Sequence, residues 1–211
     1  QSIEVTNEID QNEDNSTTIT SNKGIENNII QVTRTLSKDY WNTFCLPFDV
    51  NEDSVKLLLN NPELKVFTRE VDGTTMKFRN AETIEAGIPY IIKPSKDVVN
   101  PTFRNVTITE VEPKTITDET GNYAFVGAYS PTELKTDGTE LFLGDKDNLY
   151  KPSANDKKIN GMRAFFRIKN ASHAKQSQYN ISLDGTTTIV LHNTNDIPSK
   201  THERVYTLDG L

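Results

Sequence analysis

The chain has 211 residues, with 23 basic and 30 acidic side chains and a formal net charge of −7. This acidity disfavours a nucleic-acid groove, which needs clustered Lys and Arg, and it disfavours docking on an anionic membrane. Hydrophobic residues make up 34% of the chain, and no apolar run reaches the ~18 residues that a membrane span needs. We therefore expect a soluble domain with no transmembrane segment and no nucleic-acid partner.

The beginning of the chain and its cysteine content bear on its setting. No signal peptide is visible, and the polar start "QSIEVTNEID" is what a mature or trimmed N-terminus would leave. The only cysteine is Cys45. A single cysteine forms no intrachain disulfide, and it excludes a Cys-based zinc site and a CxxC redox motif. A chain of this length can still bury a core without disulfides.

Polarity divides the chain into three parts. Residues 1–28 are predicted to form a polar N-terminal arm or linker, because Asn, Asp, Glu, Ser and Thr dominate them. Such a stretch buries too little to offset its ordering entropy. Residues 29–191 hold most of the large apolar side chains and are predicted to form the β-sandwich domain. Residues 192–211 are predicted to be a polar connector followed by a terminal strand.

The first two strands are predicted at 29–36 and 40–50. In "IIQVTRTL", period-2 alternation places Ile30, Val32 and Arg34 on one face. In "YWNTFCLPFDV" both faces are substantially apolar, so we expect a central strand. Its alternation sorts the side chains into two sets, with Phe44, Leu46 and Phe48 on one face and Trp41, Thr43 and Cys45 on the other.

One helix is predicted, over 52–60. Asp49 and Glu52 have capping-box spacing, and Asn51 is an alternative cap. An apolar stripe at i, i+3, i+4 spacing and a following proline complete the pattern, through Val55, Leu58, Leu59 and Pro62. The single stripe indicates a helix that lies on the sheet.

The remaining signals are those of β-strands. Residues 65–80 predict a hairpin around Asp72-Gly73. Residues 86–94 predict a central strand, in which Pro89 marks a start or a bulge because it cannot donate to the ladder. Further strands are expected within 102–113, 122–131, 139–152, 161–169, 179–191 and 204–211. About ten short strands separated by turns predict an all-β fold: an antiparallel β-sandwich, jelly-roll-like, with one short helix.

Side-chain alternation also predicts which aromatic residues face solvent. In "GMRAFFRIK" the even-numbered positions are expected inside, and Arg163, Phe165 and Arg167 outside. Phe165 and Tyr150 are therefore the aromatic residues expected to be partly exposed, where a ring can stack on the apolar face of a sugar.

Two sets of residues have the chemistry of metal ligands. His173, His192 and His202 show no HExxH or other metal spacing, which favours histidines in polar loops. In "GDKDN", Asp145, Asp147 and Asn148 offer half of a calcium loop, but a full loop needs six or more oxygens. An ordinary hairpin turn is the favoured interpretation, and we expect no metal.

The sequence also lacks the usual signatures of a catalytic site. Cys45 lies in an apolar strand, where a thiol is buried and inert, and a nucleophile would need a histidine beside it. There is no GxSxG elbow and no phosphate-binding glycine loop. The segment "EVDGTT" (70–75) holds the first two acids of a jelly-roll hydrolase E-x-D-x-x-E arrangement and not the third. We expect no catalytic or cofactor-binding residues, and hence no enzyme.

Several motifs occur in a fixed order: "RTLSKDYWNTFCLPFDV", "EAGIPYIIKP", "YAFVGAYSP", "INGMRAFFRI", "DGTTTIV" and "VYTLDGL". Together they resemble a β domain of exported and cell-surface Bacteroidetes proteins, which is often C-terminal and sometimes follows leucine-rich repeats of BspA-like adhesins. The resemblance runs from about Val32 to Leu211, and the last motif is similar to the start of that family's Y-x-L-x-G tail. It implies a secreted or outer-surface location and a non-catalytic accessory or adhesive role.

Three hypotheses follow for function. The first is a non-enzymatic secreted or cell-surface interaction or structural module, monomeric, whose partner is an unidentified protein or glycan at the cell surface. The second is a carbohydrate-binding module, which predicts a row of exposed aromatics or a loop cleft. The third is a glycoside hydrolase, which predicts a deep cleft holding two carboxylates about 5–10 Å apart.

We predict that Cys45 reacts slowly with a thiol reagent in the native protein, because its strand places it in the core. Labelling with a chromogenic disulfide measures this, and the same protein in denaturant gives the unhindered rate. Native labelling as fast as labelling in denaturant would contradict a buried thiol.

Overall fold

The computed structural model describes residues 4–144, 147–169, 179–183 and 187–190. Strands hold 47% of the residues and helices 8%, which confirms the all-β fold. The elements are β1 (Asn7–Asp10), α1 (Ser16–Ser21), β2 (Asn28–Thr33), β3 (Thr35–Leu36), β4 (Asn42–Cys45), α2 (Glu52–Leu58), β5 (Glu63–Asp72), β6 (Thr75–Asn80), β7 (Pro89–Lys93), β8 (Val98–Val99), β9 (Thr102–Val106), β10 (Thr115–Thr117), β11 (Tyr123–Ala128), β12 (Thr132–Glu133), β13 (Glu140–Gly144), β14 (Asn148–Tyr150), β15 (Lys158–Ile159), β16 (Arg163–Ile168), β17 (Asn180–Leu183) and β18 (Thr187–Val190).

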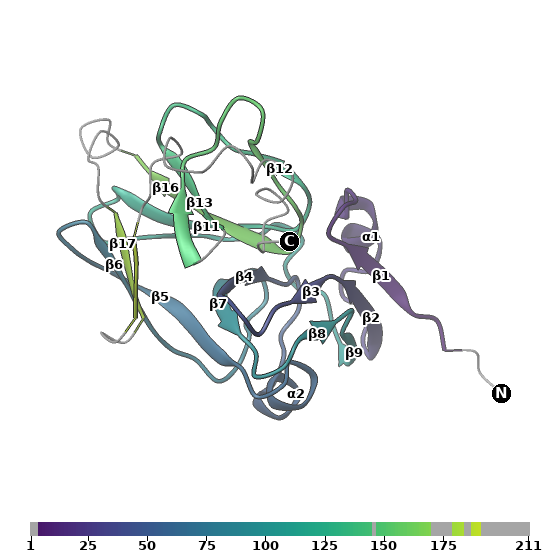
Figure 1. Ribbon diagram of the computed structural model, residues 1–211. Helices are drawn as coiled ribbons and strands as arrows, with labels where there is room; N and C mark the ends of the chain where they lie inside the picture. Colours follow the sequence, from purple (N-terminus) through teal and green to yellow (C-terminus); the bar gives the residue numbers. More distant parts are fainter. Residues whose placement is uncertain (1–3, 145–146, 170–178, 184–186, 191–211) are drawn as a thin grey trace.

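Two sheets pack face to face (Figure 1). One has the order β18-β17-β6-β5-β7-β4 and the other β10-β11-β16-β13-β14. Most pairings are antiparallel, whereas β1–β2 and β6–β17 are parallel. The packing is aromatic: the Phe78 ring of β6 lies edge-on to Phe125 of β11, with centroids 5.4 Å apart, and Phe125 stacks on Phe166 of β16 at 4.7 Å. These rings hold the two sheets together.

A third layer covers β4 and β7 from the other side. It consists of the small sheet β1-β2-β9 with α1 and α2, which lie beside the main sheets in Figure 1. The prediction that residues 1–28 form a loose arm is wrong for the described part, because Ile9 and Ile19 are buried in this layer. The buried Asn15 amide also donates to the carbonyls of Asp10 and Tyr129 at 2.9 and 2.8 Å. A few well-placed apolar side chains and satisfied backbone groups are enough to order a polar segment.

The outer face of the five-stranded sheet is also buried, contrary to expectation. Phe165 and Tyr150 are only 4% and 6% exposed, and Arg163 is 2% exposed. The pair β12–β15 covers this face with Ile159 and the adjacent Leu134, which join side chains of the sheet itself in an apolar cluster made of Ala124, Val126, Ala128, Leu134, Phe142, Tyr150, Ile159 and Phe165. Alternation along β16 correctly sorts side chains by face, but it carries no information about a cover that comes from elsewhere in the chain.

Helix α2 follows the predicted pattern with the alternative cap. Asn51 accepts a hydrogen bond from the Ser54 N–H at 2.9 Å, whereas Asp49 accepts from the Ala86 N–H at 2.7 Å. Val55 and Leu59 are buried against the sheet. The capping-box interpretation of Asp49 is therefore wrong, and a second helix, α1, was not expected.

Strand β4 is buried on both faces, as predicted, but it is not central in its sheet. It pairs with β7 alone. Two other layers bond to Thr43: its backbone carbonyl accepts from the Arg34 guanidinium at 2.7 Å, and its side-chain Oγ1 accepts from the Ala164 N–H at 3.1 Å. Arg34 itself is 1% exposed and also donates to the Met162 carbonyl.

Most of the other strand predictions that fall on described residues hold, although β9 covers only the first part of 102–113. The 65–80 hairpin is β5–β6 with Gly73 at a φ of 62°, and Pro89 is the first residue of β7, which lies between β5 and β4. Tyr179, Ile181 and Leu183 are buried. The predicted connector and terminal strand over 192–211 lie outside the described residues.

We predict that Arg34→Met lowers the free energy of unfolding by about 2–4 kcal/mol, because the buried Thr43 and Met162 carbonyls would lose a charged donor. Urea denaturation followed by fluorescence measures the change. Arg79→Met, on the exposed face of β6, is the control and should change stability by less than about 0.5 kcal/mol. Equal effects of the two substitutions would contradict the bridging role of Arg34.

Candidate functional site

A hollow beside β1 and β9, here the N-terminal cleft, has a volume of about 670 Å³. This lies within the range of about 300–1,000 Å³ that is typical of ligand sites. Its walls come from β1, the α1–β2 connection and β9, and its lining residues are Glu4, Val5, Asn7, Asn22, Ile25, Glu26, Asn27, Asn28, Ile29, Arg104 and Asn105. Five of these residues are asparagines, so amide groups dominate the polar lining.

A β-bulge shapes one wall of the cleft. The register between β2 and β9 shifts between Asn28 and Ile30, opposite Arg104 and Asn105. Asn105 takes a φ of 55°, and Asn27 on the facing loop takes a φ of 53°. Asparagine tolerates this left-handed region better than most residues. Bulges and left-handed non-glycine residues concentrate beside binding sites, where they re-aim side chains.

A relay of amides fixes the opposite wall. Asn7 Nδ2 donates to Asn28 Oδ1 at 2.8 Å, and Asn28 Nδ2 donates to Asn22 Oδ1 at 3.2 Å. Asn22 Nδ2 in turn donates to the Thr18 carbonyl of α1 at 2.8 Å. Asn28 is only 6% exposed and also accepts from the Ile29 N–H. The amide orientations are therefore set before any ligand arrives.

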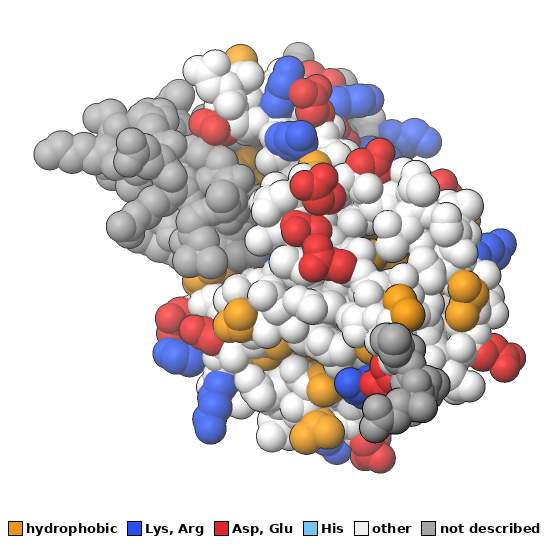
Figure 2. Space-filling model, turned by 90° about the vertical axis from the view of Figure 1, so that its right-hand side faces the viewer, with side chains coloured by type: hydrophobic (Ala, Val, Ile, Leu, Met, Phe, Trp, Pro, Cys, Tyr) orange, Lys and Arg blue, Asp and Glu red, His pale blue; other side chains and the backbone are white. Residues whose placement is uncertain are grey.

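Aliphatic side chains and one ion pair complete the cleft. Val5 and Ile25 are 71% and 49% exposed, and they are two of the four exposed large hydrophobic side chains among the described residues. Arg104 pairs with Glu4 at 2.8 Å, with both side chains largely in solvent. Figure 2 views the molecule from the side of β1 and α1, and it shows hydrophobic side chains scattered among polar ones together with a row of Asp and Glu side chains. The cleft thus offers amides, aliphatic surface and little net charge.

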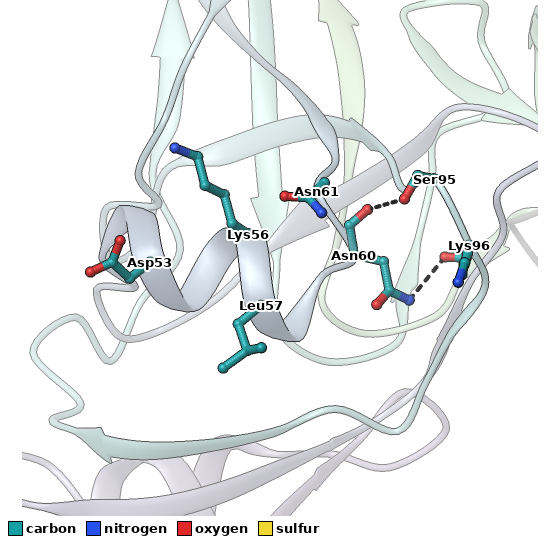
Figure 3. A pocket seen from close by; sticks show the side chains of 7 residues that line it. All are labelled: Asp53, Lys56, Leu57, Asn60, Asn61, Ser95 and Lys96. Atoms are coloured by element: carbon teal, nitrogen blue, oxygen red, sulfur yellow. Dashed lines mark hydrogen bonds between the residues drawn. The ribbon is translucent and has the colours of Figure 1, made fainter.

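A second hollow of about 390 Å³ lies beside α2 and is lined by Asp53, Lys56, Leu57, Asn60, Asn61, Ser95 and Lys96 (Figure 3). Asn60 Nδ2 donates to the Lys96 and Asp97 carbonyls, and the Asn60 carbonyl accepts from Ser95 Oγ. These bonds tie the 95–97 loop to the end of α2. Much of the polarity of this α2 pocket is therefore used to hold the fold together.

A third hollow, of about 250 Å³, also has a polar lining group that is used in bonds within the protein. Asp14 accepts from the backbone and hydroxyl of Ser16 and from the Ser130 hydroxyl. The Ser16 hydroxyl, the largest influence, lowers the pKa of Asp14 below its usual value. The carboxylate is thus occupied by the junction between the N-terminal segment and the main sheets.

The metal-ligand candidates of the sequence are placed only in part. His173, His192, His202 and Asp145 lie outside the described residues. The Asp147 carboxylate accepts from the Trp41 N–H at 2.6 Å, so it fastens the β13–β14 turn to the start of β4. Within the described ranges, no three His, Cys, Asp or Glu side chains gather as a metal-binding group.

The aromatic side chains are core residues wherever the structure describes them, except for the half-buried Tyr40. All nine Phe and Trp41 are buried, so the exposed platform expected at Phe165 and Tyr150 is absent from the described surface. Glu70 and Asp72 lie at the exposed end of the β5–β6 hairpin and line none of the three hollows described above.

Cys45 is fully buried, and its Sγ donates to the Gly87 carbonyl at 3.4 Å. Burial raises the pKa of the Cys45 thiol, so the protonated form persists at physiological pH. This placement confirms the prediction of a core thiol.

The N-terminal cleft was missed by the sequence analysis. Four of its five asparagines lie in the segment that was interpreted as a linker, and the fifth is in β9. A usable signal was present, because Asn27 and Asn28 directly precede a strand pattern and Asn105 interrupts one, positions where asparagine often adopts a positive φ.

Comparisons with family models, with curated proteins and with solved structures find no match to this chain. The fold and the site define an all-β protein with a polar surface cleft. No helix in the described part of the chain is long and apolar enough to cross a membrane.

We predict that Gly127→Ala destabilises the protein by about 1–3 kcal/mol, because a Cβ on β11 would lie 2.6 Å from Cys45 Sγ and 3.1 Å from Pro113 Cβ. In a Cys45→Ala background the cost should fall, since the sulfur has gone. Denaturant unfolding of the two single variants and the double variant measures the coupling. Additivity within about 0.5 kcal/mol would contradict direct contact between these positions.

Proposed function

We propose that this protein is a non-enzymatic interaction module, exported to the cell surface or medium, that binds its partner through the N-terminal cleft. The observation that carries the proposal is the relay of amides from Asn7 through Asn28 to Asn22, in a cleft with exposed aliphatic side chains. Amides donate and accept hydrogen bonds without titrating near neutral pH, which suits binding better than proton transfer.

Pre-organisation supports this assignment. A binding group that is already held in position loses less conformational entropy when the ligand arrives. Asn28 is buried and bonded on both sides, and the bulge at Asn105 is part of a paired strand. The β framework therefore carries two walls of the cleft, and the α1–β2 connection supplies the third.

The extracellular setting rests on the resemblance of the ordered motifs to a β domain of exported Bacteroidetes proteins. The acidic surface fits this setting, because a net charge of −7 keeps a protein dispersed and limits non-specific adhesion to anionic surfaces. Binding would then depend on the cleft rather than on overall charge.

We predict that fluorescently labelled protein binds saturably to intact cells in a panel of bacterial and animal cells, as measured by flow cytometry. Ile25→Arg should weaken this binding at least about tenfold, because a long charged side chain would occupy the cleft. Leu57→Arg makes the same change at an exposed position of the α2 pocket and should leave binding within about twofold.

Circular dichroism and urea unfolding confirm that both variants fold, as their exposed positions predict. An absence of saturable binding to every cell in the panel would refute the proposed function. Binding that both variants retain, or that both lose equally, would refute the assignment to the cleft.

A further inference from the structure

Resting on the proposed function, we propose that the ligand of the N-terminal cleft is a neutral glycan chain, held by hydrogen bonds between its hydroxyl groups and the asparagine amides. Each sugar hydroxyl is both a donor and an acceptor, and each side-chain amide offers two donor hydrogens and an acceptor oxygen. A wall of amides can therefore pair with a row of hydroxyls in either hydrogen-bond direction.

The cleft has unused hydrogen-bonding capacity on both sides. Asn7 Oδ1 accepts no hydrogen bond from a described residue, although the Nδ2 of the same amide is held by Asn28. The side-chain amides of Asn27 and Asn105 make no hydrogen bond to a described residue and are exposed. In the α2 pocket, by contrast, the Asn60 amide is consumed by the neighbouring loop.

The charge of the cleft favours a neutral ligand. Arg104 is the only basic residue in the lining, and it already pairs with Glu4 at 2.8 Å. The remaining charged residue of the lining is Glu26, which would repel an acidic sugar. A ligand without charge leaves the Arg104–Glu4 pair intact and pays no desolvation cost for a charge of its own.

The aliphatic rim suits the C–H faces of sugar rings. Val5 and Ile25 expose apolar surface beside the amides. Burying the C–H face of a ring against these side chains removes apolar surface from water, while the hydroxyls at the ring edge reach the amides.

A peptide that adds as a strand is the competing ligand, and the edge of β1 disfavours it. Strand addition needs the unpaired N–H and C=O groups of an edge strand. At Asp10 both groups are already bonded to the Asn15 amide, at 3.0 and 2.9 Å. The acidic Glu8 stands beside that position on a strand of only four residues. Short, charged edges of this kind resist pairing.

We predict that the protein binds neutral oligosaccharides on a printed array of neutral and acidic glycans, with a dissociation constant then measured by isothermal titration calorimetry. Asn105→Gly should weaken the affinity about threefold to tenfold, as expected for one lost neutral hydrogen bond. Glycine suits the positive φ at this position, so the backbone of the bulge is kept. Asn7→Ala, which removes the outer end of the relay, should have a larger effect.

Asn61→Gly is the matched control, because Asn61 has a φ of 43° and lines the α2 pocket. Its affinity should stay within about twofold of that of the wild type. Raising the salt concentration should leave the affinity unchanged, since the ligand carries no charge.

Treating the cells before the binding assay distinguishes the glycan inference from the proposed function. Mild periodate, which cleaves sugar diols, should abolish cell binding, whereas trypsin shaving should spare it. A silent array together with cell binding that survives periodate and is lost with trypsin would refute the glycan and leave a protein partner. Selective binding to acidic glycans would refute the neutral class, and equal effects of Asn105→Gly and Asn61→Gly would refute the site.

Discussion

The buried guanidinium of Arg34 joins the three layers of the fold. It follows β2 of the small sheet, and it donates to the Thr43 carbonyl in β4 and to the Met162 carbonyl just before β16. The guanidinium carbon, Cζ, also lies 5.6 Å from the centre of the Phe44 ring. A charge that is 1% exposed is costly to desolvate, and fixed carbonyl dipoles and an aromatic face offset that cost. The bond to the Thr43 carbonyl also satisfies a backbone acceptor of β4, a strand that pairs with β7 alone.

The parts of the fold that sequence reasoning found are those set by local pattern. Alternation placed Ile30, Val32 and Arg34 on one face, and all three are buried. Proline chemistry limited Pro89 to a strand start or a bulge, and it is the first residue of β7. The errors concern contacts between distant segments. Nothing local to β16 shows that β12–β15 covers Phe165, and nothing local to β4 shows that Arg34 and Ala164 bond to Thr43. Such features depend on loop closure and layer packing, which are non-local.

Local sequence patterns did not predict the candidate site, for a related reason. Phe165 and Tyr150 were the aromatic residues expected to be partly exposed, yet both are buried, and the buried aromatic rings of the described chain are spread over all three apolar clusters. The cleft uses asparagines, which in a single sequence also indicate turns and linkers. The asparagines form a recognisable site only in the folded sheet, where β1, β2 and β9 bring Asn7, Asn28 and Asn105 to one end.

The cleft depends on the buried layer behind it. Left-handed conformations at Asn27 and Asn105 cost free energy, and they persist only where the surroundings over-determine them. Here Ile9, Ile30 and Phe103 hold the strands that carry the cleft, since all three are at most 1% exposed in one core cluster. The packing of the small sheet thus stabilises both the bulge and the amide relay. A ligand that matches the amides of the cleft would meet a backbone that is already in place, and its selectivity would come from the spacing of its hydroxyl groups rather than from charge.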